Sequence, residues 1–91
     1  MNWTFGDVVD FLKQHNFVLA HTRGSHYYYH GKVDGQERMV QVQYHGRVPL
    51  KPKTLRDGIA KQSGIPEKYW LDWAKAGQKR LRKNIRYNGA K

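Results

Sequence analysis

Apolar residues near the start of the chain recur at the spacing of one face of a helix: Phe5, Val8, Val9 and Leu12. Positions i, i+3, i+4 and i+7 lie on one side of an α-helix, so this segment predicts an amphipathic helix. Thr4, with Asp7 three residues later, is typical of a capping box at a helix start. Asn16 is suited to the left-handed conformation that ends many helices. We therefore expect a first helix between Thr4 and Asn16.

Short β-prone runs follow, and they predict three strands, over residues 17–21, 26–31 and 38–44. The third run alternates between two faces, with Val40, Val42 and Tyr44 on one and Met39, Gln41 and Gln43 on the other. Residues 23–25 form the first predicted turn. Asp34 followed by Gly35 is a strong signal for a two-residue hairpin. The three strands are therefore expected to be consecutive and antiparallel.

A second helix is expected between Pro52, which is suited to the first helical position, and Gly64, which ends it. Leu55 and Ile59 supply its buried side. Gly58, in the middle of this helix, is expected to allow a close approach to a neighbour.

A third helix is expected over residues 66–76, with a break at Gly77. The element order is then helix, three strands, helix, and a helical appendage. Three hairpin-joined strands with flanking helices predict an α+β fold, in which the helices cover one face of an antiparallel sheet and the other face stays open.

The size of the chain limits what it can hold. A chain of 91 residues is expected to form one small domain with a single core. It contains no cysteine, so neither a disulfide framework nor a thiolate zinc site is expected. The sequence predicts no membrane span and no export signal, so the cytoplasm is the expected location.

The net charge of +10 is unevenly distributed. Residues 75–91 hold seven basic residues and no acidic one, whereas residues 1–74 hold ten basic and seven acidic ones. The end of the chain is therefore suited to a polyanion or to an acidic partner protein. The alternative interpretation is a solvated, partly helical extension without a ligand.

His26 is the candidate for acid–base chemistry, because it lies where a turn opens into the second predicted strand. An imidazole titrates near pH ~6.5 in model peptides, so it can take or give a proton at neutral pH. A hydrolase pair of Ser25 with His26 is disfavoured, since neighbouring strand residues point to opposite faces. The chain has five histidines, but they lack metal-ligand spacing and acidic residues are sparse.

A set of residues keeps a recognisable order and spacing: Phe17, Gly24, Ser25, His26, Val42, His45, Leu50, Lys51, Pro52, Thr54, Leu55, Arg56, Ile59 and Gly64. With them, residues 4–65 resemble the HicA (YcfA-like) toxins, small messenger-RNA endoribonucleases of bacterial and archaeal toxin–antitoxin pairs. Asn16 stands where a glycine is usual, and Gln43 where a proline often precedes the second histidine. Both departures concern turn geometry and leave the chemistry unchanged.

The resemblance implies a double-stranded-RNA-binding-like fold, a single catalytic histidine at His26, and a HicB-type antitoxin that covers this histidine. Residues 66–91 run past the usual end of the family. We therefore expect a HicA-like domain over 1–65 and a helical and basic extension over 66–91, which either joins the same domain or forms an arm.

The chemistry is consistent with RNA cleavage that needs neither a metal nor another cofactor. The neighbouring 2′-hydroxyl is the nucleophile, a base removes its proton, an acid protonates the departing 5′-oxygen, and cations stabilise the charge. His26 is expected to act as the general base or acid. His45 has two interpretations that stay open: a second acid or base, or a bond to the loop backbone.

The side chains expected to bind RNA are Arg23, Ser25, Tyr28, Arg47, Lys51, Lys53 and Arg56. The basic ones lie beside His26, in the loop after the third strand, or at the start of the second helix, where unpaired amides also attract phosphate. Tyr28 shares the face of His26 and can stack on a base. The alternatives to an endoribonuclease are a non-catalytic RNA-binding module and, less favoured, a DNA-binding regulator.

Overall fold

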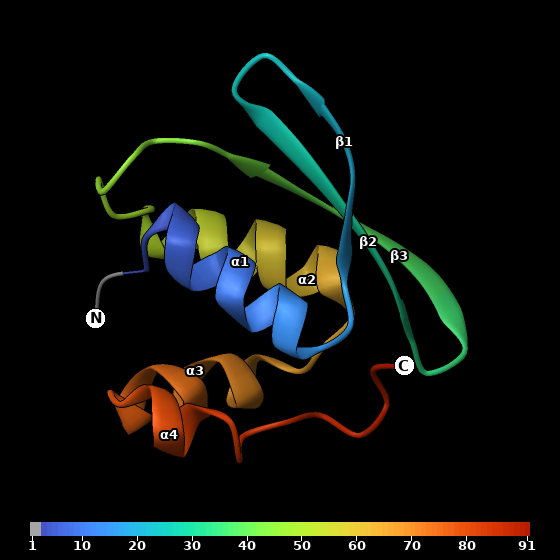
Figure 1. Cartoon of the computed structure of the whole chain (residues 1–91), viewed down its shortest axis with the longest axis vertical. Helices are drawn as coiled ribbons and strands as arrows, with labels where there is room; N and C mark the ends of the chain where they lie inside the picture. The colour runs from blue at the N-terminus through green and yellow to red at the C-terminus, as the bar shows by residue number, and fades with distance from the viewer. Residues whose placement is uncertain (1–2) are drawn as a thin grey trace.

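Three antiparallel strands form one sheet in the order β1-β2-β3 (Figure 1): β1 Val18–Arg23, β2 His26–Val33 and β3 Gln36–Gln43. The computed structural model describes residues 3–91, so the first two positions of the expected domain lie outside the described residues. The helical segments are α1 Phe5–Gln14, η1 Thr54–Ile59, α2 Ala60–Ser63, α3 Glu67–Ala76 and α4 Lys79–Arg82. The predicted α+β class is confirmed, with strand ends shifted by one or two residues.

Local signals correctly predicted the start and stop of the first helix and the hairpin between β2 and β3. The Thr4 hydroxyl accepts a hydrogen bond from the Asp7 N–H (3.2 Å), and the Asp7 carboxylate accepts one from the Thr4 N–H (3.1 Å), so the capping box is confirmed. Asn16 has a φ of 67° and ends the turn after α1. Asp34 and Gly35, with φ of 52° and 79°, form the hairpin between β2 and β3, as predicted for a two-residue turn with both φ positive.

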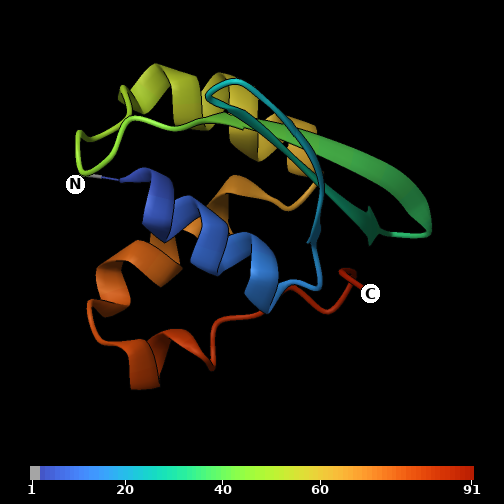
Figure 2. The same cartoon turned by 45° about the horizontal axis from the view of Figure 1, so that its top comes forward.

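The helices cover one face of the sheet, and α1 lies between the sheet and α3 (Figures 1 and 2). Val40 and Val42 of β3 point into this core and are fully buried. Gly31 of β2 also faces it, because an added Cβ there would lie 2.6 Å from the ring of Phe17. The absence of a side chain at Gly31 thus lets the segment after α1 pack directly on the sheet.

The other face of the sheet is open, as predicted. The β2–β3 register pairs His26 with Gln43 and Tyr28 with Gln41, so these four side chains share the open face. All six residues of β1 are exposed, and the register shifts between Leu19 and His21. β1 therefore adds backbone pairing to the sheet but little to the core.

The second helix starts at Pro52 and ends at Gly64, whose φ of 74° confirms the predicted stop. Leu55 and Ile59 are buried, as expected. Its first part, η1, is a π-helix, in which the Ala60 N–H donates to the Leu55 carbonyl. The expectation for Gly58 is wrong: a Cβ there would meet nothing within 4 Å.

Residues 66–91 pack on the rest of the chain. Trp70 and Trp73 of α3 are buried in the same hydrophobic cluster as Phe11 of α1, and the Phe11 and Trp70 rings stack at 3.8 Å. The Arg82 guanidinium of α4 lies 4.1 Å from the centre of the Trp73 ring. These two tryptophans therefore cover the core.

The C-terminal segment (residues 83–91) returns to the sheet. Ala90 pairs with Val33, the Asp34 N–H donates to the Gly89 carbonyl (2.9 Å), and the Lys91 N–H donates to the Lys32 carbonyl (2.9 Å). The pairing of β1 with β2 stops at Val18 and His30. The C-terminal segment therefore pairs with the part of β2 that β1 does not reach.

The end of α1 also holds this segment. The Gln14 amide nitrogen donates to the carbonyls of Arg82 and Ile85, each at 2.8 Å. His15 is fully buried and uses both ring nitrogens: Nδ1–H donates to the Phe11 carbonyl (2.9 Å), and Nε2 accepts from the Tyr87 N–H (3.0 Å). None of the helices within residues 3–91 has the length and apolarity of a membrane span.

Candidate active site

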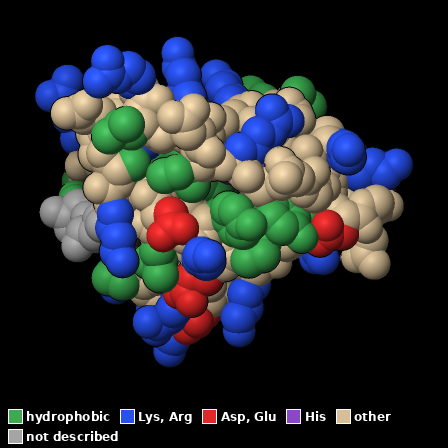
Figure 3. Space-filling view, turned by 90° about the horizontal axis from the view of Figure 1, so that it is seen from below, with side chains coloured by type: hydrophobic (Ala, Val, Ile, Leu, Met, Phe, Trp, Pro, Cys, Tyr) green, Lys and Arg blue, Asp and Glu red, His purple; other side chains and the backbone are tan. Residues whose placement is uncertain are grey.

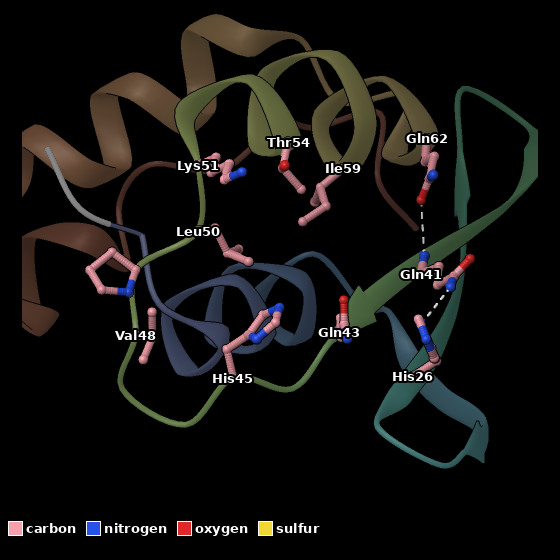
Figure 4. Close-up of a pocket in the computed structure, with 11 residues that line it drawn as sticks. His26, Gln41, Gln43, His45, Val48, Leu50, Lys51, Thr54, Ile59 and Gln62 are labelled. Carbon is pink, nitrogen blue, oxygen red and sulfur yellow. Dashed lines mark hydrogen bonds between the residues drawn. The ribbon is translucent and has the colours of Figure 1, made fainter.

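A cavity of about 500 Å³ lies where β3 runs out into the following loop and faces the second helix (Figure 4). The strands contribute His26, Gln41 and Gln43 to its lining. The loop and the helix contribute His45, Val48, Pro49, Leu50, Lys51, Thr54, Ile59 and Gln62. We call this cavity the His26 groove. Its lining combines apolar and polar side chains, and within the described chain none of the lining side chains is acidic.

His26 is the first residue of β2, directly after the turn in which Gly24 has a φ of 59°. This backbone conformation favours glycine, and it turns the chain so that His26 pairs with Arg23 on one side and Gln43 on the other. The Ser25 carbonyl accepts from the Tyr44 N–H (2.7 Å), which ties the turn to the end of β3. His26 is half-buried, so its ring is held by the sheet and still reached from solvent.

Two glutamines join His26 to the second helix. The side-chain nitrogen of Gln41 lies 2.7 Å from His26 Nδ1. The backbone N–H of Gln41 donates to the side-chain oxygen of Gln62 on α2 (2.9 Å), as Figure 4 shows. Because β3 is an edge strand of the sheet, Gln62 satisfies a backbone amide that no neighbouring strand binds.

Of the residues predicted to bind RNA, the structure brings Lys51 into the groove with His26. Arg23 and Ser25 are exposed beside His26, on β1 and in the turn. Tyr28 lies on the same face, as predicted, but its ring stacks on His21 at 4.3 Å. Arg23, Ser25 and Tyr28 therefore lie near His26 in the sheet or in the turn, but unlike Lys51 they do not line the groove.

The other predicted residues lie outside the groove walls. Arg47 and Lys53 are exposed in the loop and at the helix start. Arg56 lines a different pocket, beside Trp3 and Trp70, and its guanidinium pairs with Asp57 at 3.3 Å. The sequence correctly placed Arg56 on the second helix, but it did not predict the direction in which the side chain points.

Sequence reasoning missed the neutral polar lining: Gln41, Gln43, Thr54 and Gln62. A signal existed for the first two, since the two-residue hairpin fixes a register that puts Gln43 opposite His26. No such signal existed for Thr54 and Gln62, because their direction depends on how the helix packs. His45 lines the groove and is exposed. Within residues 3–91, no three His, Asp or Glu side chains are close enough together to hold a metal ion.

One comparison with known proteins identifies the family of the chain. A family model described as the HicA toxin of bacterial toxin-antitoxin matches residues 5–65 of the 91. No curated protein and no solved structure matches the chain closely. The matched span runs from the start of α1 to just past α2, so it includes every residue that lines the His26 groove. Since the match covers more than half of the chain, the protein belongs to the HicA toxin family, the RNA-cleaving toxins of toxin–antitoxin systems.

Proposed function

We propose that this protein is the toxin of a type II toxin–antitoxin pair and cleaves messenger RNA in the cytoplasm, with His26 as the general base or acid. The observation that carries the proposal is the position of His26: a half-buried imidazole at the end of an open groove that also holds Lys51. The family supplies the reaction class, and the groove supplies a place where RNA can meet the imidazole.

The reaction needs only the RNA and this site. The 2′-oxygen attacks the adjacent phosphorus, so the 2′-O–P bond forms and the P–5′-O bond breaks. The proton of the 2′-hydroxyl goes to a base, and an acid gives a proton to the departing 5′-oxygen. The products are a 2′,3′-cyclic phosphate and a 5′-hydroxyl, and no metal takes part in the balance.

The side chains proposed to bind RNA have separate roles. Lys51 lies in the groove and stabilises the negative charge that develops on the phosphorane. Arg23 and Ser25, beside His26, bind the neighbouring phosphates, and Tyr28 stacks on a base after leaving His21. Arg47, Lys53 and Arg56 guide the strand from further away, through charge alone.

The partner is proposed to be a HicB-type antitoxin that covers the His26 groove. The unit that carries the activity is residues 1–65, and residues 66–91 are an extension fixed to it through Trp70 and Trp73. The antitoxin would inhibit cleavage simply by excluding RNA from the groove.

The experiment is cleavage of a single-stranded RNA in excess EDTA, with the matched DNA as control. We expect cleavage with 2′,3′-cyclic phosphate and 5′-hydroxyl ends, and no cleavage of DNA, which lacks the 2′-hydroxyl. Dependence on divalent ions, or a 5′-phosphate product, would contradict the proposal. Tight RNA binding without cleavage would identify the alternative, a non-catalytic RNA-binding module.

A further inference from the structure

The hydrogen bond between Gln41 and His26 joins two side chains that are not direct partners in the sheet. His26 is opposite Gln43, and Gln41 is opposite Tyr28, so the contact crosses diagonally between β2 and β3. Diagonal neighbours on one face of a sheet lie within reach of long side chains. The atoms joined are the Gln41 side-chain nitrogen and His26 Nδ1, 2.7 Å apart.

Gln41 is held in place more firmly than an ordinary surface glutamine. Its backbone N–H is bound by Gln62 of α2 at 2.9 Å, and its strand is paired with β2. The backbone of Gln41 is therefore fixed, so its side chain starts from a defined point near the ring, and Figure 4 shows the contacts from Gln62 through Gln41 to His26.

This contact gives the two ring nitrogens of His26 different roles. A nitrogen engaged by the protein is not free to exchange a proton with RNA, so Nδ1 is excluded and Nε2 is left. While the amide N–H donates to Nδ1, the neutral ring carries its proton on Nε2. For Nε2 to take a proton from RNA, the neutral ring must carry its own proton on Nδ1, and the amide then turns over so that its oxygen accepts from Nδ1–H. The same bond persists in the imidazolium, whose Nε2–H can give its proton back. A glutamine thus supports both protonation states, whereas a carboxylate would favour the charged one.

We propose that Gln41 is the positioning residue of His26: it binds Nδ1, orients the imidazole toward the groove, and leaves Nε2 as the nitrogen that exchanges protons with RNA. The kinetic part of this inference rests on the proposed function. The other titratable groups near the ring are Arg23, opposite it on β1, and His45 and Lys51 in the groove lining. Within residues 3–91, none of the three is hydrogen-bonded to the ring.

The first test is nitrogen-15 NMR of the His26 ring at a pH where it is neutral, which needs no enzymatic activity. Gln41→Met keeps the side-chain length and removes the hydrogen bond. We expect the Nδ1 resonance to move toward that of an unbonded ring nitrogen in this variant. Gln36→Met, the same change at an exposed position on the same strand and outside the groove, is expected to leave it in place. An Nδ1 resonance that is identical in wild type and Gln41→Met would overturn the proposal.

The second test is RNA cleavage under single-turnover conditions. Losing one hydrogen bond is expected to lower the cleavage rate of Gln41→Met about tenfold with RNA affinity unchanged. Gln41→Glu is expected to keep activity but to move the pH profile to higher pH, because its carboxylate stabilises the imidazolium. If wild type cleaves and both variants match it in rate and profile, the positioning role is wrong while the proposed function stands. If wild type does not cleave, the proposed function fails, and the NMR test still decides the contact.

Discussion

At the scale of single residues, the chemistry depends on side chains whose immediate neighbours restrict them. His26 has one ring nitrogen engaged by Gln41, and its backbone is set by the left-handed Gly24. His15 has both nitrogens engaged and is fully buried. These contacts suit the two histidines to different roles: a ring with a free nitrogen at a groove can exchange protons, as proposed for His26, whereas a ring with both nitrogens engaged holds structure.

Gly31 gives a prediction about packing. Gly31→Ala places a methyl group 2.6 Å from the Phe17 ring, so we expect it to lower the free energy of unfolding by ~1 to 3 kcal/mol. Gly58→Ala adds a methyl group into open space within a helix, and is expected to be neutral or to stabilise by up to ~1 kcal/mol. Urea denaturation of both variants measures the difference. A Gly31→Ala variant as stable as wild type would show that Phe17 does not pack as described.

At the scale of elements, the sequence predicts what is encoded in neighbouring residues. Thr4 with Asp7, Asp34 with Gly35, and Gly64 mark their turns and caps correctly, because the bonds or dihedral angles they need are local. The π-helical start of the second helix has no comparable signal, because it depends on packing against the sheet.

Contacts between distant residues were not predictable in the same way. Gln62 bonds to Gln41 across 21 positions of sequence, and Tyr87 bonds to His15 across 72. A polar residue such as Gln62 on a helix shows no periodicity that reveals its partner. The sequence therefore indicated His26, the proposed catalytic residue, through a local motif, but not the glutamines around it.

The hydrogen bond between His15, after α1, and Tyr87 of the C-terminal segment gives a prediction about pH. Burial lowers the pKa of His15, and the nearby Arg86 charge lowers it further, against the raising effect of the bond to Phe11. Protonation of Nε2 would also remove the acceptor of the Tyr87 N–H. Since the unfolded chain binds this proton more tightly, the contribution of His15 to stability is complete above about pH 6.5 and is lost as the pH falls toward the folded pKa.

We expect the free energy of unfolding to fall from pH 7.5 to 5, with a slope from this group of at most ~1.4 kcal/mol per pH unit. His15→Gln removes the titrating group and is expected to flatten this slope, although it lowers stability at neutral pH. Hydrogen exchange of the Tyr87 amide should quicken in acid in the wild type. An equal slope in wild type and His15→Gln would show that other groups cause the acid sensitivity.

At the scale of the whole molecule, the His26 groove and the basic end of the chain lie on different elements. The groove is at the edge of the sheet, whereas α3 and α4 lie across α1 from the sheet (Figures 1 and 2). Seen from the side of α3 and α4, Lys and Arg side chains stand among acidic and hydrophobic ones (Figure 3). On this face the basic side chains therefore belong to a mixed, folded surface. Arg82 shows the same point, because it packs on Trp73 and contributes to the fold.

The central claim is that the imidazole of His26 drives RNA cleavage, and the most direct measurement is the single-turnover cleavage rate of His26→Ala. His30→Ala is the matched control, since His30 lies on the same strand and the same face, pairs with Glu37, and does not line the groove. We predict that His26→Ala loses at least ~10²-fold in rate while folding and RNA affinity are kept, and that His30→Ala cleaves at the wild-type rate. Cleavage by His26→Ala at the wild-type rate would contradict the account.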